Sequence, residues 1–182
     1  MVNLKDVAFS ALDIGFENGF QSIEIKKNFL IDNNKSILVI MENETVIQNI
    51  IARLKLDYNY LNFIRAPMSE YEKHGKLHLK KDYESDLNGL FYDISVEYSS
   101  MQLVLYTDDL NFIATVDAEK NICIAISTTY FPKIVSRNET KEWNKRLYEF
   151  ALYSEQVQKK LINTYSDFLF TECQPVVPSE NA

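Results

Sequence analysis

The sequence has very little of the residue types from which compact catalytic and metal centres are built. Its 182 residues include two cysteines, two histidines and four glycines. Cys123 and Cys173 are too few for a disulfide framework or a zinc site made of four thiolates. The glycines lack the GxGxxG and GxxxxGK spacings that cradle nucleotide phosphates, and no GxSxG motif presents a serine nucleophile. We therefore predict no catalytic residues, no cofactor and no metal.

Long apolar runs are also missing. No run approaches the ~18 residues that a membrane-spanning helix needs. The amino end has no basic segment followed by an apolar stretch, which is the pattern of a secretory signal. We therefore expect a cytoplasmic protein with no membrane association.

Positive charge is scarce relative to negative charge. The chain has 19 Lys and Arg against 26 Asp and Glu, which gives a net charge of −7. A wide nucleic-acid groove needs clustered positive charge, so direct nucleic-acid binding is not expected. The hydrophobic fraction of 46% is ordinary for a globular domain, and the length suits one domain with a real core.

Hydrophobic periodicity predicts one α+β domain over 1–170, followed by a disordered C-terminal tail over 171–182. An antiparallel sheet, made of an N-terminal hairpin and a four-stranded meander, would be packed by N-terminal, mid-chain and long C-terminal helices. The predicted elements are helices over 3–15, 43–54 and 138–170, a hairpin of 21–31 with 36–41, and a meander over 90–131. The strand over 36–41 is apolar on both faces, which favours a central place in the sheet. Ser136 and Glu139 have the spacing of a helix capping box.

The two histidines could hold a metal only if they shared one face of a helix. His74 and His78 lie in a segment that alternates like a strand, Lys76-Leu77-His78-Leu79-Lys80. Residues four apart on a strand are roughly 13 Å apart, which is too far for one ion. This pair therefore predicts no metal site.

The segment from Lys73 to Lys81 is the one basic concentration in the chain, with four lysines and no acidic residue. One interpretation is a patch for phosphate, RNA or an acidic partner. Two others are a charged edge strand that resists aggregation and a loop arm neutralised by the acids that follow at 82–86. The segment contains no arginine, so bidentate phosphate recognition is not implied.

An enzymatic alternative rests on Asp13, Glu24 and Lys26. Two acids that bind a divalent ion and a lysine that steadies the attacking water form the core of some metal-dependent nucleases. The Glu-x-Lys spacing is short and matches by chance in a chain of this composition. A nuclease-like enzyme is therefore kept only as an alternative.

Tyrosine and acidic residues suggest a protein-binding surface. The chain has 11 tyrosines, and Tyr58, Tyr60 and Tyr130 are among those on strands or irregular segments. Tyrosine offers a large contact area with a polar tip, which favours interfaces. The candidate interface consists of Asp82, Tyr83, Glu84, Asp86, Tyr106, Asp108 and Asp109.

These features favour a non-enzymatic acidic module that inhibits or sequesters a partner protein. Immunity proteins and phage anti-defence inhibitors have this profile. An acidic binder also captures basic nucleic-acid-processing enzymes quickly. The order helix, hairpin, helix at the start of the chain is similar to type III secretion chaperones, which implies a dimer as a further alternative. An apolar seam over 143–168 could supply that contact, so both monomer and homodimer stay open.

Overall fold

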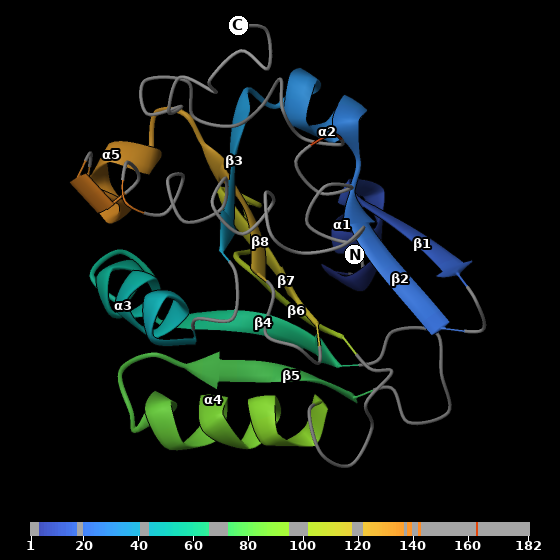
Figure 1. Ribbon diagram of the computed structural model, residues 1–182. Coiled ribbons are helices and arrows are strands. Elements are labelled where there is room, and N and C mark those ends of the chain that lie inside the picture. The colour runs from blue at the N-terminus through green and yellow to red at the C-terminus, as the bar shows by residue number, and fades with distance from the viewer. Residues whose placement is uncertain are drawn as a thin grey trace, which may run out of the picture.

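A computed structural model describes residues 4–17, 20–40, 44–65, 73–94, 102–117, 122–136, 138–139, 142 and 163. Its centre is a six-stranded antiparallel sheet with the strand order β3-β8-β7-β6-β4-β5 (Figure 1). The strands of this sheet are β3 (Lys35–Ile40), β4 (Tyr60–Arg65), β5 (Lys73–His78), β6 (Leu103–Tyr106), β7 (Phe112–Val116) and β8 (Ile122–Ser127). The α+β class with an antiparallel sheet is thus confirmed.

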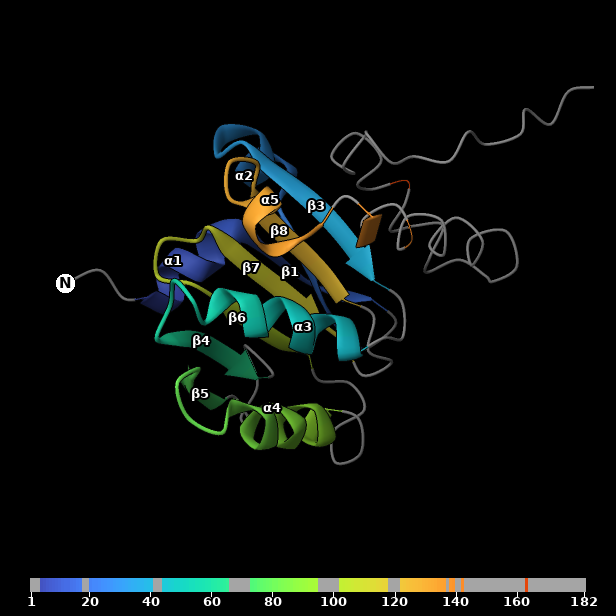
Figure 2. The same cartoon turned by 90° about the vertical axis from the view of Figure 1, so that its left-hand side faces the viewer.

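Two layers cover the two faces of this sheet. On one face lie the helices α3 (Glu44–Leu54), α4 (Tyr83–Tyr92) and α5 (Phe131–Ile134). On the other lie α1 (Leu4–Ala11), α2 (Lys27–Asp32) and a separate hairpin of β1 (Leu12–Glu17) with β2 (Phe20–Ile25). Figure 1 shows α3 and α5 to the left of the sheet and the β1–β2 hairpin to its right. Figure 2 looks onto the helix-covered face, with α3 and α5 in front of the strands. Alternate strand residues therefore enter two separate apolar cores.

The predicted N-terminal helix and hairpin were wrong in detail. The helix ends at Ala11 instead of residue 15, because Leu12 is buried by pairing with Ile25 in an antiparallel ladder. The change of hydrophobic phase near Lys27 marks the start of α2 and not a bulge. The hairpin of 21–31 with 36–41 therefore does not form, and β3 pairs with β8 instead.

β3 lies at the edge of the sheet, although its sequence predicted a central strand. Ile37 and Val39 enter the core beneath the hairpin, whereas Leu38 enters the core beneath the helices. Both faces of the strand are covered, so both are apolar. An apolar run on both faces therefore reports the covering layers and not the position of the strand within its sheet.

The middle of the chain confirms two predictions and corrects a third. The apolar stripe predicted for α3 is 0–5% exposed; it consists of Val46, Ile47, Ile50, Ile51 and Leu54. β6, β7 and β8 form a three-stranded meander in the predicted region. The fourth predicted strand, from Leu90 to Tyr98, was wrong up to residue 92, because that segment belongs to α4. Leu87, Leu90 and Phe91 are buried at helical spacing, which overrides the alternation from Leu90 onwards.

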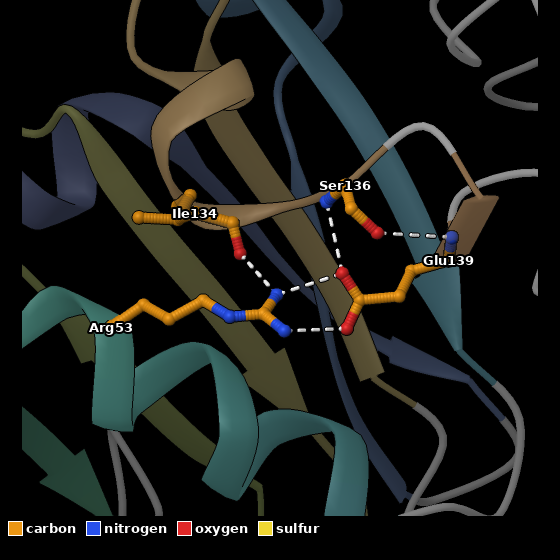
Figure 3. Close-up of polar contacts among 4 residues, drawn as sticks. All are labelled: Arg53, Ile134, Ser136 and Glu139. Atoms are coloured by element: carbon orange, nitrogen blue, oxygen red, sulfur yellow. Dashed lines mark hydrogen bonds and ion pairs between the residues drawn. The ribbon is translucent and has the colours of Figure 1, made fainter.

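Glu139, in the segment after α5, forms the predicted capping box with Ser136 and also contacts Arg53 of α3 (Figure 3). The Glu139 amide donates to Ser136 Oγ at 3.2 Å, and the Ser136 amide donates to Glu139 Oε2 at 2.9 Å. Arg53 of α3 adds a bidentate contact, with Nη1 and Nη2 at 2.8 and 2.6 Å from the Glu139 carboxylate. Arg53 Nη1 also donates to the Ile134 carbonyl at 2.8 Å. Most of the predicted helix over 138–170 and the tail over 171–182 lie outside the described residues.

Replacing Glu139 with glutamine should lower the free energy of unfolding by about 1–2 kcal/mol at neutral pH. The hydrogen bond from Arg53 is the main reason that the pKa of Glu139 falls from 4.5 to about 2. Because the folded-state pKa is depressed, this contribution is present above about pH 4.5 and is lost as the pH falls towards 2. Urea unfolding at neutral and at acidic pH measures this effect. The exposed Asp32→Asn variant is the control, and an equal loss at both pH values would contradict the assignment.

No helix in the described ranges is both long and apolar enough to cross a bilayer.

Candidate functional site

The sheet topology brings polar side chains from distant segments together at one end of the strands. The antiparallel order places the starts of β3, β7 and β4 beside the ends of β8, β6 and β5. We call the polar side chains at this end of the sheet the polar rim. They are Lys35, Asp57, Tyr58, Tyr60, Asn62, Thr107, Asp108, Asp109, Asn111 and Tyr130.

Asp109 is the centre of the hydrogen-bond network in the rim. Its Oδ1 accepts from Thr107 Oγ1 at 2.7 Å and from the Asn111 amide at 3.0 Å. Its Oδ2 accepts from Asn111 Nδ2 at 2.7 Å and from the Tyr58 hydroxyl at 3.0 Å. Four donors therefore satisfy the carboxylate of this exposed residue, and hydrogen bonds to the charged form keep such a group ionised.

The electrostatics of the rim follow from these contacts. Burial alone would raise the pKa of Asp109, but the hydrogen bonds from Asn111, Thr107 and Tyr58 hold it below its ordinary value. Burial, reinforced by the charge of Asp109, raises the pKa of the Tyr58 hydroxyl. Burial lowers the pKa of Lys35, whose ammonium donates to the Leu110 carbonyl at 2.6 Å. The negative charge of Asp109 is thus fixed on the protein frame.

Asp108 connects the same turn to β4. Its Oδ2 accepts from the Tyr60 hydroxyl and its Oδ1 accepts from Asn62 Nδ2, both at 2.6 Å. Asn62 is only 5% exposed, so this bond satisfies a buried amide. Asp108 therefore has a structural role in the sheet, in addition to any contact that its charge could make with a partner.

Tyr130 is a further tyrosine of the rim and contacts Tyr58. The Tyr130 hydroxyl donates to Asp57 Oδ2 at 2.7 Å, and burial together with this contact raises the pKa of Tyr130 well above 10. The rings of Tyr58 and Tyr130 meet edge to face, with centroids 6.0 Å apart. Hydroxyl and carboxylate groups in the rim are thus committed to internal hydrogen bonds. The arrangement is suited to rigid presentation of a surface and not to nucleophilic or acid–base chemistry.

The acidic residues at the start of α4 differ from the rim acids in their neighbours. Asp82, Glu84 and Asp86 are exposed at the start of this helix, which contains no basic residue. Within the described segment 73–94, no ion pair joins the lysines to these three carboxylates. The predicted mutual neutralisation of the basic and acidic stretches is therefore not seen there. Their charge is free to act on solvent and on an approaching molecule.

The two tyrosines of the candidate interface do not contribute contact area. Tyr83 is 4% exposed and belongs to the core beneath α4. Tyr106 is 3% exposed in the opposite core, where burial and the charge of Asp108 raise its pKa to about 12. Tyr92, which is not among the predicted interface residues, is 57% exposed on α4. The surface tyrosine of this helix is thus residue 92.

The structure brings the residues of the enzymatic alternative close together. Asp13 and Glu24 are direct cross-strand partners in β1 and β2. Together with Lys26 they line a pocket of about 580 Å³, whose other lining residues are Ile25, Lys27 and Asn28. Like charges directly opposite each other on a sheet are destabilising. The Lys26 ammonium donates to the Phe9 carbonyl at 3.3 Å, which gives this lysine a structural role at the end of α1.

The histidines lie on one strand, as expected. His74 and His78 are both exposed on β5, four residues apart. In the described part of the chain, no three His, Cys, Asp or Glu side chains are grouped so that they could hold a metal ion.

No family model matches the sequence, and no curated protein or solved structure shows detectable similarity to it. The argument for function therefore rests on the residues and the geometry above.

Sequence reasoning missed the partners that hold the rim acids. Asn62, Thr107 and Asn111 donate to Asp108 or Asp109. The signal for Thr107 and Asn111 was available, because Thr-Asp-Asp-x-Asn is a turn composition in which side chains bond to nearby backbone. Asn62 had no local signal, since its contact depends on the pairing of β4 with β6.

Proposed function

We propose that this chain is a non-enzymatic protein-binding module that inhibits or sequesters a partner, in the manner of an immunity protein or a phage anti-defence inhibitor. The partner is a basic protein, with nucleic-acid-processing enzymes as the leading class. The binding surface is the exposed surface of α4, which we call its acidic face. It carries Asp82, Glu84 and Asp86 at the start of the helix and Tyr92 at its last residue.

The observation that carries this proposal is the contrast between two sets of acids. Asp108 and Asp109 are also exposed, but both accept hydrogen bonds from side chains of neighbouring segments. Asp82, Glu84 and Asp86 are exposed on a helix with no basic residue. Uncompensated surface charge of one sign steers an oppositely charged partner and raises its association rate.

The exposed ring of Tyr92 supports the same surface. Among the described residues it is one of three large hydrophobic side chains that are exposed, and it lies on the helix that carries the acids. Tyrosine is enriched among the residues that dominate binding energies at interfaces. An aromatic anchor on the same helix as charges that steer the partner is the composition expected of an inhibitor surface.

The experiment that tests this proposal is affinity capture from lysate of the source organism or its host, read by native mass spectrometry. We expect a stoichiometric complex with a basic protein. The same measurement gives the mass of the free chain, which distinguishes a monomer from a homodimer. A chain that captures no stoichiometric protein would contradict the proposal.

The second candidate function is a divalent-metal-dependent nuclease, favoured by the cross-strand pairing of Asp13 and Glu24 beside a pocket. If these acids bind an ion, saturating Mg²⁺ or Mn²⁺ should stabilise the protein by at least about 2 kcal/mol, because a ligand that binds only the folded state adds stability. Our primary proposal predicts no such gain. Thermal unfolding with each ion measures it, and Asp13→Asn with Glu24→Gln is the variant that would abolish a true metal effect.

A further inference from the structure

The basic stretch has a defined place in the fold. β5 is the last strand of the described sheet, and its only sheet neighbour among the described residues is β4. In the register, Tyr60 faces His78, Asn62 faces Lys76 and Ile64 faces His74. Figure 1 shows β5 between β4 and α4 at the lower end of the molecule. The basic side chains therefore lie along one border of the sheet.

One face of β5 is not covered by either core layer. Leu77 enters the core beneath the helices, so His74, Lys76 and His78 project from the opposite face. The core on that opposite side, under α1 and the β1–β2 hairpin, contains no residue of β5. All three side chains are exposed. The hairpin layer thus stops short of β5.

The positive charge on this face is held in place by an aromatic ring. Lys76 Nζ lies 3.7 Å from the centroid of the Tyr60 ring, and the Tyr60 hydroxyl is fixed by Asp108. The His78 ring packs against the same tyrosine, with centroids 6.4 Å apart. A cation–π contact orients the ammonium without neutralising it. The face is therefore pre-organised for an anion.

We propose that the uncovered face of β5, formed by His74, Lys76 and His78 on Tyr60, binds an extended acidic segment of a partner protein. Alternate residues on a strand are roughly 6.6–7 Å apart, which is also the spacing of alternate side chains in an extended peptide. Acidic side chains at every second position of such a segment can therefore meet Lys76 and His78, which both lie on this face.

An acidic peptide fits this face better than single-stranded nucleic acid does. Non-specific binding of single strands relies on open aromatic faces for base stacking, and Lys76 already covers the Tyr60 ring. The nearby Arg65 is paired with Asp93, so its guanidinium is engaged. This face and the acidic face of α4 have opposite signs, so either can bind without the other.

Fluorescence anisotropy with a labelled peptide of alternating Glu and Thr tests the proposal on the full chain. We expect saturable binding of this peptide at low salt and none of a Lys–Thr peptide. Lys76→Gln with His78→Gln should raise the dissociation constant about tenfold. Both residues are exposed, so the variant should fold, which thermal unfolding checks. Lys27→Gln, on exposed α2, is the control that should bind normally.

Three results would overturn the proposal. The first is an absence of Glu–Thr peptide binding by the unchanged protein. The second is equal binding by the unchanged protein and the Lys76–His78 variant. The third is tighter binding of a single-stranded oligonucleotide of matched charge, which would assign the face to nucleic acid. None of these results bears on capture through α4, so the two proposals fail separately.

Discussion

Reversing the three acids of α4, as Asp82→Lys, Glu84→Lys and Asp86→Lys, should slow association with the captured partner at least tenfold at low salt. These carboxylates are exposed and lie on a helix with no basic residue. Charged residues on the rim of an interface act mainly on the association rate and its salt dependence. Stopped-flow or surface-based kinetics at several salt concentrations measure the change. The difference between the proteins should shrink as salt screens the charges.

A matched control separates local steering from total charge. Asp6→Lys, Asp13→Lys and Asp32→Lys reverse three exposed acids on other elements and change the net charge equally, from −7 to −7 + 6 = −1. Glu84 and Asp86 also favour the N-terminus of α4, and Asp6 does the same for α1. Unfolding curves of both triple variants therefore accompany the kinetics. If both variants slowed association by the same factor, α4 would not be the binding surface.

Replacing Asp109 with alanine should lower the free energy of unfolding by about 1–3 kcal/mol. The substitution removes an acceptor that serves four donors, from Thr107, Asn111 and Tyr58. A buried donor left without a partner, such as the Thr107 hydroxyl, accounts for this cost, whereas the donors exposed to solvent can turn to water. Urea unfolding at neutral pH measures the loss. Asp32→Ala, on the exposed surface of α2, should change stability by less than about 0.5 kcal/mol.

The pH dependence gives the same residue a second test. The hydrogen bonds hold the pKa of Asp109 below its ordinary value in the folded state. Its contribution is therefore present above the unfolded pKa of about 3.9 and is lost as the pH falls through the lower folded value. The gap in stability between the unchanged protein and Asp109→Ala should narrow in acid. A gap that is small at neutral pH, or constant with pH, would contradict the central place of Asp109 in the rim.

Local patterns predicted the elements that are locally determined. The buried positions of α3, the meander of β6 to β8 and the Ser136–Glu139 capping box all follow from spacing along the chain. The pairing of β3 with β8 and of β4 with β6 joins segments far apart in sequence. No residue of a strand specifies a distant neighbour, so strand order could not be predicted. Residues 90–92 were wrongly predicted to form a strand, because a short apolar segment fits both the helical and the alternating hydrophobic period.

The candidate site was predictable in its charges but not in its exposure. Asp82, Glu84 and Asp86 are on the surface, where acidic residues are expected. Tyr83 and Tyr106 are buried because each lies on the inward side of its element. Their exposure depends on which layer covers that side, and the layers became known only with the fold. The same reason hid Tyr92 and the uncovered face of β5.

The rim and the two charged surfaces have complementary roles in the proposed function. The hydrogen bonds of Asp108 and Asp109 connect the start of β4 with the turn between β6 and β7. They lie at the end of the sheet where β5 leads into α4. Buried Leu87, Leu90 and Phe91 hold α4 against the sheet. A rigid frame reduces the entropy that is lost when a surface binds. The frame therefore presents α4 and β5 without needing to rearrange.

Parallel capture by three proteins tests the central claim most directly. The unchanged chain, the α4 triple reversal and the matched control reversal are each used to capture partners from the same lysate. Native mass spectrometry then measures the fraction of each protein in a stoichiometric complex. Our proposal predicts the same basic partner on the unchanged chain and the control, and its loss from the α4 variant. The claim is contradicted if no partner is captured, or if all three proteins retain it equally.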